Sequence, residues 1–252
     1  MLNNRVIPSL LLSNNGLVKT IKFKKEIYIG DPINTIRIFN EKEVDELSLI
    51  DIHASKNKSG PNFQTIQRVT DECFIPLSYG GGIRNIEDIE KIFKIGVEKV
   101  ILNSSAILNP NLINEASKMF GSQSIVVSVD IKKDFFGKLN IIKPYNNKKI
   151  SISVNDYILD MQDRGAGEIL VNDINRDGVM QGMNLDFIKN ISKELQIPLI
   201  AAGGVGDLQH IKEGIDAGAS AVAVGSFFVF NGPLKAVLIS YPDYNTLQNL
   251  FK

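Results

Sequence analysis

The chain has 252 residues, of which 44% are hydrophobic and 22% are charged, as in an ordinary soluble globular protein. Its 28 basic residues balance its 28 acidic residues, so the overall charge does not indicate binding to nucleic acid or to a membrane. The single cysteine, Cys73, excludes an internal disulfide, and His53 and His210 belong to no cluster with metal-ligand spacing. We find no apolar run of membrane length and no signal-peptide pattern. We therefore expect a soluble, cytoplasmic protein without a metal or another cofactor.

The first half of the chain predicts four strands, each followed by a helix. The strands are short and apolar, as buried parallel strands are, and cover residues 5–12, 46–52, 74–78 and 99–103. The helices cover residues 33–42, 60–72, 85–95 and 111–120. Asp31-Pro32 marks the first helix start as a cap followed by a first-turn proline. A hairpin-like extension at residues 18–20 and a mobile polar loop at residues 22–31 are also expected.

The second half repeats this order. Its predicted strands cover residues 124–130, 167–172, 197–201 and 221–224. Helices are expected at residues 153–164, 184–195 and 207–217, with a last one beginning within 234–240, and residues 138–149 form a polar, β-like excursion. Strands that alternate strictly with helices predict an α/β fold, here one (β/α)8 TIM barrel over residues 1–252. An open doubly wound sheet is the alternative, but the number of strands and the equal halves argue against it.

One pattern occurs twice in register. An apolar run ends in glycines, a helix follows, and a second apolar run ends in a small polar residue. The matched pairs are Ile75 and Ile197, Pro76 and Pro198, Gly81 and Gly203, Gly82 and Gly204, Gly96 and Gly218, and Ser104 and Ser226. A single insertion would destroy this register. We interpret the chain as a tandem duplication of two half-barrels, approximately residues 1–122 and 123–252.

The repeated glycines and strand ends suit phosphate groups. Glycine permits positive φ and lets a ligand approach the backbone, and the N–H groups at a helix start attract anions. If the halves pack about a pseudo-twofold axis, two such sites lie on opposite sides of one mouth. The ligand would then be elongated, with an anionic group at each end. The alternative is that these glycines form only tight turns.

In a TIM barrel the chemistry lies at the C-terminal ends of the strands. That end receives Asp51, Gly82, Asn103, Asp130, Asp173, Asp177, Gly204 and Ser226. Asp130 is the strongest candidate for a general acid or base, because it ends a β-branched run and emerges into the mouth. Partial burial would raise its pKa and nearby lysines would lower it. The alternative is a helix cap or an ion pair with Lys132 or Lys133.

A set of motifs spans almost the whole chain and keeps its order with few gaps. The motifs are Arg5-Val-Ile-Pro8, Val18-Lys19, Gly30-Asp-Pro32, Asp45-Glu-Leu47, Ile50-Asp-Ile52, Ile75-Pro-Leu77, Gly80-Gly-Gly-Ile-Arg84, Asn103-Ser104, Phe120-Gly-Ser-Gln123, Gly165-Ala-Gly-Glu-Ile-Leu170 and Arg176-Asp-Gly178. Together they resemble the cyclase subunit of imidazole glycerol phosphate synthase, the HisF family of histidine biosynthesis. The resemblance implies a duplicated half-barrel that takes ammonia from a glutaminase partner. It also implies a reaction that splits and cyclises a substrate with two phosphates.

Matched by position, the resemblance implies roles for three groups of residues. One phosphate site would be Gly82, Asn103 and Ser104, and the other Gly178, Gly204, Gly225 and Ser226. Asp130 matches a catalytic aspartate and Lys19 an active-site lysine. Arg5, Glu46, Lys99 and Glu168 match a charged ring that gates ammonia at the N-terminal end of the barrel. The alternative is a purely structural ring of salt bridges. Residues 120–123 and Glu98 would dock the glutaminase there.

The sequence departs from the family pattern at Leu11. The family has a second catalytic aspartate at this position, and leucine can neither accept nor donate a proton. Loss of a general acid or base typically costs about 10²–10⁴-fold in rate. The excursion that begins at Tyr145 also lacks the expected glycine-rich pattern.

In this respect the chain is more similar to family paralogues from surface-polysaccharide gene clusters. These are associated with converting an acetamido sugar into an acetamidino sugar, alongside a glutaminase and a separate amidotransferase. That likeness implies a phosphorylated or nucleotide-linked sugar as the ligand. The alternatives are a genuine histidine-pathway cyclase that tolerates Leu11, and a non-catalytic scaffold that activates the glutaminase. The sister isomerase of the pathway is disfavoured, because it also relies on the first aspartate and needs no charged gate.

Overall fold

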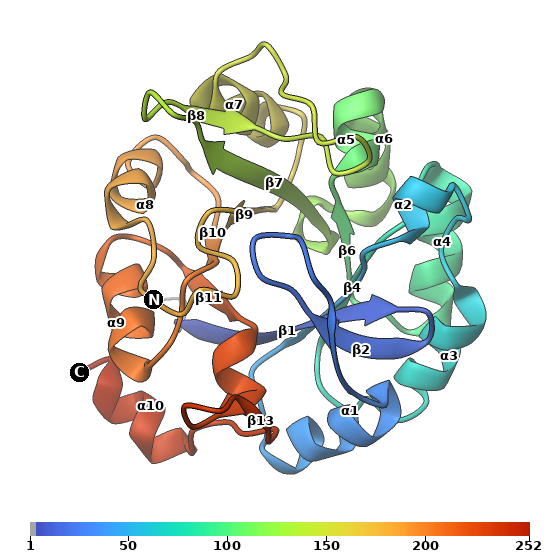
Figure 1. Ribbon diagram of the computed structural model, residues 1–252. Helices are drawn as coiled ribbons and strands as arrows, with labels where there is room; N and C mark the ends of the chain where they lie inside the picture. The colour runs from blue at the N-terminus through green and yellow to red at the C-terminus, as the bar shows by residue number, and fades with distance from the viewer. Residues whose placement is uncertain (1–3) are drawn as a thin grey trace.

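Short apolar strands and amphipathic helices close into a barrel in the computed structural model, which describes residues 4–252 (Figure 1). The barrel strands in order are β1 (Arg5–Ser13), β4 (Leu47–Asp51), β5 (Leu77–Gly80), β6 (Lys99–Leu102), β7 (Ile125–Lys133), β9 (Glu168–Asp173), β10 (Leu199–Ala202) and β11 (Ala221–Val224). Neighbouring strands pair in parallel, and β11 closes on β1 with Ala221 opposite Arg5. The predicted (β/α)8 barrel is confirmed, and the open sheet is excluded.

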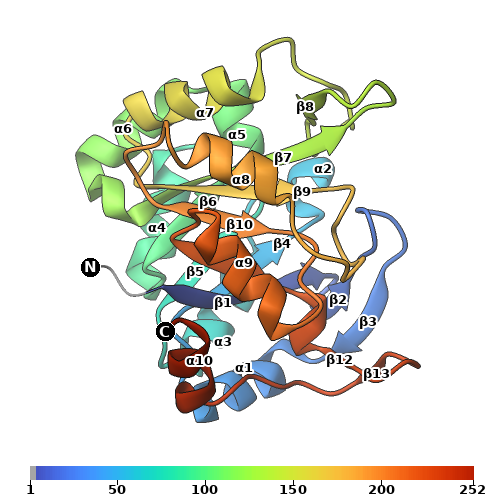
Figure 2. The same ribbon diagram turned by 90° about the vertical axis from the view of Figure 1, so that its left-hand side faces the viewer.

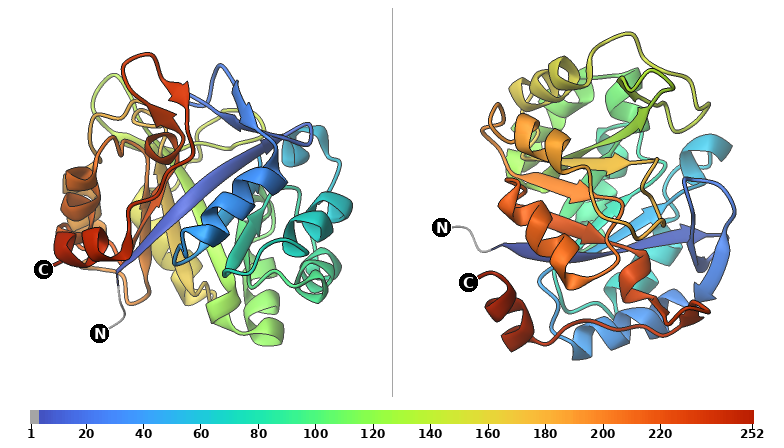
Figure 3. Two further views of the ribbon diagram at one scale, coloured as in Figure 1. Left: turned by 90° about the horizontal axis from the view of Figure 1, so that it is seen from below. Right: turned by 60° about the vertical axis from the view of Figure 1, so that its left-hand side comes forward.

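The outer layer consists of helices that surround the strands (Figures 1 and 3), and their apolar residues pack into the core. These helices are α1 (Pro32–Glu41), α3 (Phe63–Thr70), α4 (Ile86–Ile95), α6 (Asn111–Phe120), α7 (Val154–Asp163), α8 (Leu185–Ile191), α9 (Leu208–Asp216) and α10 (Tyr244–Leu250). In α1, for example, Ile36 and Phe39 are fully buried. The side chain of Asp31 accepts a hydrogen bond from the Asn34 N–H, as its predicted role of N-cap requires.

Smaller elements extend beyond the barrel. Three are hairpins at the C-terminal ends of strands: β2 (Gly16–Lys19) with β3 (Ile27–Gly30), β8 (Leu139–Ile141) with β7, and β12 (Phe230–Asn231) with β13 (Ala236–Val237). Figure 2 shows all three on the side of the barrel away from the N-terminus. The short helices are α2 (Ala54–Asn57), α5 (Ser104–Leu108), η1 (Ser122–Ser124) and η2 (Ser226–Phe228).

Three predicted elements need correction. Residues 27–30 belong to a strand rather than a mobile loop, because Tyr28 pairs with Val18 across the hairpin. The third strand begins at Leu77 rather than at residue 74. Residues 234–240 do not start a helix: their apolar spacing is helix-like, but Ala236 pairs with Asn231 in a hairpin. The last helix begins only after Asp243, whose side chain caps the Thr246 N–H.

Alternation of side chains along the strands produces two apolar layers. Outward-facing residues such as Val6, Leu47 and Leu102 pack under the helices. Inward-facing residues fill the middle of the barrel: Ile7, Ile101, Val126, Leu170, Ile200, Ala221 and Ala223. This inner layer separates the N-terminal end of the barrel from the C-terminal mouth. Among residues 4–252, no helix is both long enough and apolar enough to cross a membrane.

Candidate active site and the charged ring

Four charged side chains meet at the N-terminal end of the barrel, as the sequence predicted. Arg5, Lys99 and Glu168 open their strands, and Glu46 directly precedes β4. Arg5 lies 2.8 Å from Glu46 and 2.9 Å from Glu168. Lys99 lies 2.8 Å from Glu46 and 3.3 Å from Glu168. Bases and acids therefore alternate around a closed ring.

The ring is buried on its acidic side. Glu46 is 3% exposed and Glu168 is 8% exposed, and each carboxylate contacts both cations. Burial opposes the charge on Arg5, but the carboxylates of Glu168 and Glu46 outweigh it and raise the Arg5 pKa. With two positive and two negative members, the ring neutralises itself at the base of the inner apolar layer. Glu98 and η1 lie at the same end of the barrel, because they directly precede β6 and β7.

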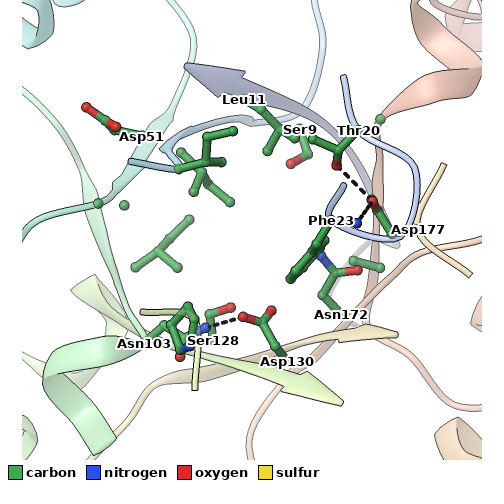
Figure 4. A pocket seen from close by; sticks show the side chains of 18 of the residues that line it. Ser9, Leu11, Thr20, Phe23, Asp51, Asn103, Ser128, Asp130, Asn172 and Asp177 are labelled. Atoms are coloured by element: carbon green, nitrogen blue, oxygen red, sulfur yellow. Dashed lines mark hydrogen bonds between the residues drawn. The ribbon is translucent and has the colours of Figure 1, made fainter. Parts of the chain in front are cut away.

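A cavity of about 320 Å³ occupies the opposite end, at the C-terminal mouth (Figure 4). Its apolar floor consists of Leu11, Ile50, Ile101, Leu170, Ala202 and Ala223. Every residue predicted for catalysis or phosphate binding lines it: Lys19, Gly82, Asn103, Ser104, Asp130, Gly178, Gly204, Gly225 and Ser226. The fold thus gathers residues from both halves of the chain into one site.

Asp130 enters this cavity from β7 and is 6% exposed. Its Oδ2 accepts a hydrogen bond of 2.9 Å from the side-chain amide of Asn103, which directly follows the neighbouring strand β6. Burial raises the pKa of Asp130 to about 7, against the lowering effect of the Asn103 hydrogen bond, and Asp177 adds a further increase. Lys132 and Lys133 point to solvent instead. The alternative of an ion pair with these lysines is therefore not supported.

Lys19 reaches the mouth from β2 and is 4% exposed. Its ammonium group donates a hydrogen bond to the backbone carbonyl of Ser9. Burial lowers the Lys19 pKa to about 8, although Asp177 acts to raise it. A Cβ atom at residue 225 would lie 2.8 Å from the Lys19 Nζ, so Gly225 makes room for this side chain. Lys19 and Asp130 are therefore both able to exchange protons near neutral pH.

Leu11 faces Asp130 across the mouth (Figure 4). It lies on β1, where it pairs with Ile50 of β4 and Val18 of β2. In the closed order of strands β1 and β7 stand on opposite sides of the barrel. An apolar side chain therefore occupies the position opposite the acid, as expected from the sequence.

The predicted phosphate positions form two groups. Gly82, Asn103 and Ser104 follow β5 and β6, and the other group follows β9, β10 and β11 on the opposite side. However, a Cβ atom at Gly82 would lie 2.5 Å from the Gly60 backbone, and one at Gly204 would lie 2.0 Å from the Gly182 carbonyl. Close packing of the chain against itself, the tight-turn alternative, accounts for these two glycines without a ligand.

Two of the aspartates predicted at the mouth have local structural roles. Asp51 lines the cavity, and its Oδ1 accepts hydrogen bonds of 3.0 Å from the N–H groups of His53 and Ala54. Asp173 lies at the C-terminal end of β9, as predicted, but it is not among the residues that line the cavity. Its carboxylate accepts bonds from the Asn175 N–H at 2.9 Å and the Asn184 amide at 3.1 Å.

Sequence reasoning missed a contact at the rim. His53 Nε2 lies 2.8 Å from Glu26, and Glu26 also accepts a 2.8 Å hydrogen bond from the Ser13 hydroxyl. The three residues come from separate segments, and no local sequence motif predicts that they are in contact. Across the described residues, no group of three or more His, Cys, Asp or Glu side chains is arranged to hold a metal ion.

The closed barrel and its polar mouth define an α/β-barrel protein whose site is assembled at the C-terminal strand ends. A family model described as "Histidine biosynthesis protein" matches residues 5–234. A proposed imidazole glycerol phosphate synthase subunit hisF2 of Pseudomonas aeruginosa is 47% identical over 98% of this chain and 99% of its own length. A proposed subunit HisF of Leptospira borgpetersenii is 47% identical over 100% of both chains. A proposed subunit hisF3 of Vibrio vulnificus is 45% identical over 96% of this chain and 94% of its own. The chain belongs to the HisF family and is a HisF-like, cyclase-type subunit of the imidazole glycerol phosphate synthase family.

Proposed function

We propose that this HisF-like subunit channels ammonia from a glutaminase to a sugar rather than to the histidine-pathway substrate. The glutaminase docks at the N-terminal end of the barrel. The ligand at the mouth is a phosphorylated or nucleotide-linked sugar. Ammonia replaces the amide oxygen of its acetamido group, which leaves as water, and gives an acetamidino group. The reaction takes place in the cytoplasm and its product serves surface polysaccharide.

The N-terminal end supports the ammonia source. HisF homologues pair with a HisH glutaminase subunit, and the closed ring of Arg5, Glu46, Lys99 and Glu168 lies at the base of this barrel. Movement of Lys99 away from either glutamate opens the ring without breaking a strand pair, since its ammonium lies at the end of a flexible side chain. Ammonia entering there would pass the inner layer around Ile7 and Ile101 to reach the mouth.

The lining of the mouth suits an anionic ligand, and of the two positions where the family has catalytic aspartates it keeps a carboxylic acid only at Asp130, since Leu11 occupies the other. Asp130, with a pKa raised to about 7 by burial, serves as the general acid or base. Lys19, with a pKa lowered to about 8 by burial, supplies a cation beside the Gly225-Ser226 end of β11. The two groups of strand ends on opposite sides of the cavity hold the anionic groups of the ligand.

One observation carries the choice of substrate: Leu11 stands opposite Asp130 at the mouth. A reaction that needs a proton donor on one strand and a proton acceptor on the facing strand has only Asp130 on β7, because Leu11 on β1 can be neither. The sugar reaction therefore differs from histidine-pathway cyclisation in the group that receives ammonia, while the barrel, the ring and the phosphate positions are retained.

Ammonia-dependent turnover of the histidine-pathway substrate tests this proposal, at high pH with an ammonium salt and no glutaminase. We expect no turnover by the natural chain and measurable turnover by Leu11→Asp, with a gain of about 10²–10⁴-fold if the aspartate restores the missing acid or base. Leu11→Asn is the matched control, because it has a similar shape without the acid. Robust turnover by the natural chain would identify a genuine histidine-pathway cyclase. If neither sugar nor histidine-pathway substrate reacts but the glutaminase is stimulated, the barrel is a scaffold.

A further inference from the structure

The hairpin of β7 and β8 ends in two phenylalanines that contact almost nothing. Phe135 is 98% exposed and Phe136 is 91% exposed, and their ring centroids are 5.6 Å apart. The turn is well formed beneath them, because the Asp134 side chain accepts hydrogen bonds from the Phe136 and Lys138 N–H groups. Large apolar side chains that are gathered on an exposed surface are typical of protein–protein or membrane interaction sites.

A second apolar tip stands on the opposite side of the mouth. In the hairpin of β12 and β13, Leu234 is 93% exposed, and Leu238 just after it is 54% exposed. Figure 1 places β8 and β13 on opposite sides of the barrel, and in Figure 2 both hairpins project from the same end to a similar level. Two separated, convex tips at one level fit a flat partner better than they fit a single pocket.

The segments around these tips are strongly basic. Their exposed lysines are Lys22, Lys24, Lys25, Lys132, Lys133, Lys138, Lys148 and Lys235. Within residues 4–252 none of these eight has an ion-pair partner, whereas the nearby acids Glu26 and Asp134 are already paired with His53 and Lys149. The whole chain has a formal net charge of +0, so these lysines form a local basic surface rather than part of an overall positive charge.

We propose that the mouth face of the barrel docks on an anionic phospholipid bilayer, with Phe135, Phe136 and Leu234 at the headgroup level and the lysines against the lipid phosphates. Exposed apolar side chains that insert shallowly, combined with basic residues, are the two signals that reversible membrane binding requires. A bilayer offers both a flat surface and a dense negative charge, which the paired tips and the unpaired lysines match. Overall composition predicted no membrane partner, because averaging over the chain conceals this asymmetry.

The chain contains no tryptophan, so a single introduced indole reports on one position. We expect the emission of Phe135→Trp to shift to the blue with vesicles of phosphatidylglycerol and phosphatidylcholine, and to be quenched by brominated lipids in them. Raising the salt should reverse the shift, since screening weakens the lysine contacts. Phe74→Trp is the matched control: Phe74 is 85% exposed but precedes β5 at the other end of the barrel, and its emission should not change.

Vesicle sedimentation of the full chain gives a second measurement. Phe135→Ser with Phe136→Ser should weaken partitioning by about tenfold or more, and Lys132→Gln with Lys133→Gln should also weaken it, while Phe74→Ser should not. Thermal unfolding checks that each variant is folded. The proposal is overturned if the natural chain ignores anionic vesicles, if the serine variant binds them equally well, or if Phe74→Trp shifts as strongly as Phe135→Trp. Absence of vesicle binding would assign the tips to a protein partner instead.

Discussion

At the mouth, a proton on Asp130 is favoured by what surrounds it. The side chain is 6% exposed, has one hydrogen-bond partner in Asn103, and shares the cavity with the negative charge of Asp177. Leucine at position 11 contributes no charge to this balance, whereas a second carboxylate there would raise the Asp130 pKa further by repulsion. The Leu11→Asp variant should therefore titrate differently from the natural chain as well as react differently.

Burial of Asp130 makes the stability of the protein depend on pH. Because burial raises its folded pKa to about 7 from the ordinary value of 3.8, the folded state holds this proton at pH values where the unfolded state has lost it. The contribution is fully present below about pH 4 and is lost as the pH rises through about 7. Asp130→Asn removes the ionisable group, so it should raise the free energy of unfolding at pH 8 relative to the natural chain. The gain should be at most about 4 kcal/mol, at about 1.4 kcal/mol per pKa unit.

Urea unfolding at pH 5 and pH 8 measures this effect. The difference between Asp130→Asn and the natural chain should shrink at pH 5, where the folded protein already carries the proton. Asp163→Asn, at the exposed end of α7, is the control for a carboxylate outside the cavity. An equal effect of Asp130→Asn at both pH values would show that the carboxylate is not perturbed by burial.

At the scale of elements, the hairpin of β2 and β3 is tied across the mouth to the loop after β9. Asp177 Oδ2 accepts hydrogen bonds from the Thr20 hydroxyl at 2.9 Å and the Phe23 N–H at 3.3 Å, and the Asp177 carbonyl accepts one from the Lys22 N–H at 3.0 Å. Burial raises the Asp177 pKa in opposition to these bonds. This carboxylate thus fixes the segment that carries Lys19 into the cavity.

Asp177→Ala should loosen this segment while the barrel stays folded. Hydrogen bonds to a charged group contribute about 1.5–3 kcal/mol, so hydrogen exchange of residues 20–26 should become about tenfold faster or more. Hydrogen–deuterium exchange with mass spectrometry measures the change, and Asp163→Ala provides the control. If protection of residues 20–26 is unchanged, the backbone bond from Lys22 holds the hairpin without the side chain.

Most barrel elements were predictable because each carries its own local signal. The side chains of Asp31 and Asn85 cap helices, and Gly96 ends α4 with the left-handed φ of 111° that glycine favours. The short helices α2 and α5 were missed, since neither is long enough to show a helical period. The expected helix at residues 234–240 failed because the apolar residues Leu234 and Leu238 face solvent rather than the core.

The site was predictable to the extent that strand ends determine it. Asp130 was placed at the mouth because it follows an apolar strand, and Leu11 because of the family resemblance; both line the cavity. The contact of Asn103 with Asp130 and the meeting of Glu26 with His53 depend on how separate loops pack, and no spacing encodes this. Asp173 ends β9 as predicted but does not line the cavity, because adjacent residues on a strand point to opposite faces and Asn172 takes the inward position.

At the scale of the whole molecule, the charged ring links β1, β6 and β9 with the residue before β4. Lys99→Met leaves two buried carboxylates that share only Arg5. We expect this variant to lower the free energy of unfolding by about 3 kcal/mol. This is the lower end of the cost of breaking a buried ion pair, and it applies here because Arg5 still contacts both carboxylates.

A double variant distinguishes a connected ring from independent pairs. Lys99→Met combined with Glu168→Gln should cost less than the sum of the two single variants, since the second change removes a carboxylate that the first left short of a partner. Urea denaturation of the three variants and the natural chain supplies the comparison. Additive losses would mean that Lys99 and Glu168 act independently, despite the 3.3 Å between them.

The pairing of β1 with β11 also has a consequence for how the protein is made. Val6, near the start of the chain, pairs with Val222, which the ribosome adds only after most of the chain has emerged. Until then the free edge of β1 and the latest strand both expose unpaired backbone groups, which favour aggregation. The nascent chain therefore depends on chaperones or rapid elongation for longer than a protein built from local contacts. A ribosome stalled before β11 would present an incomplete barrel to the cell's proteases.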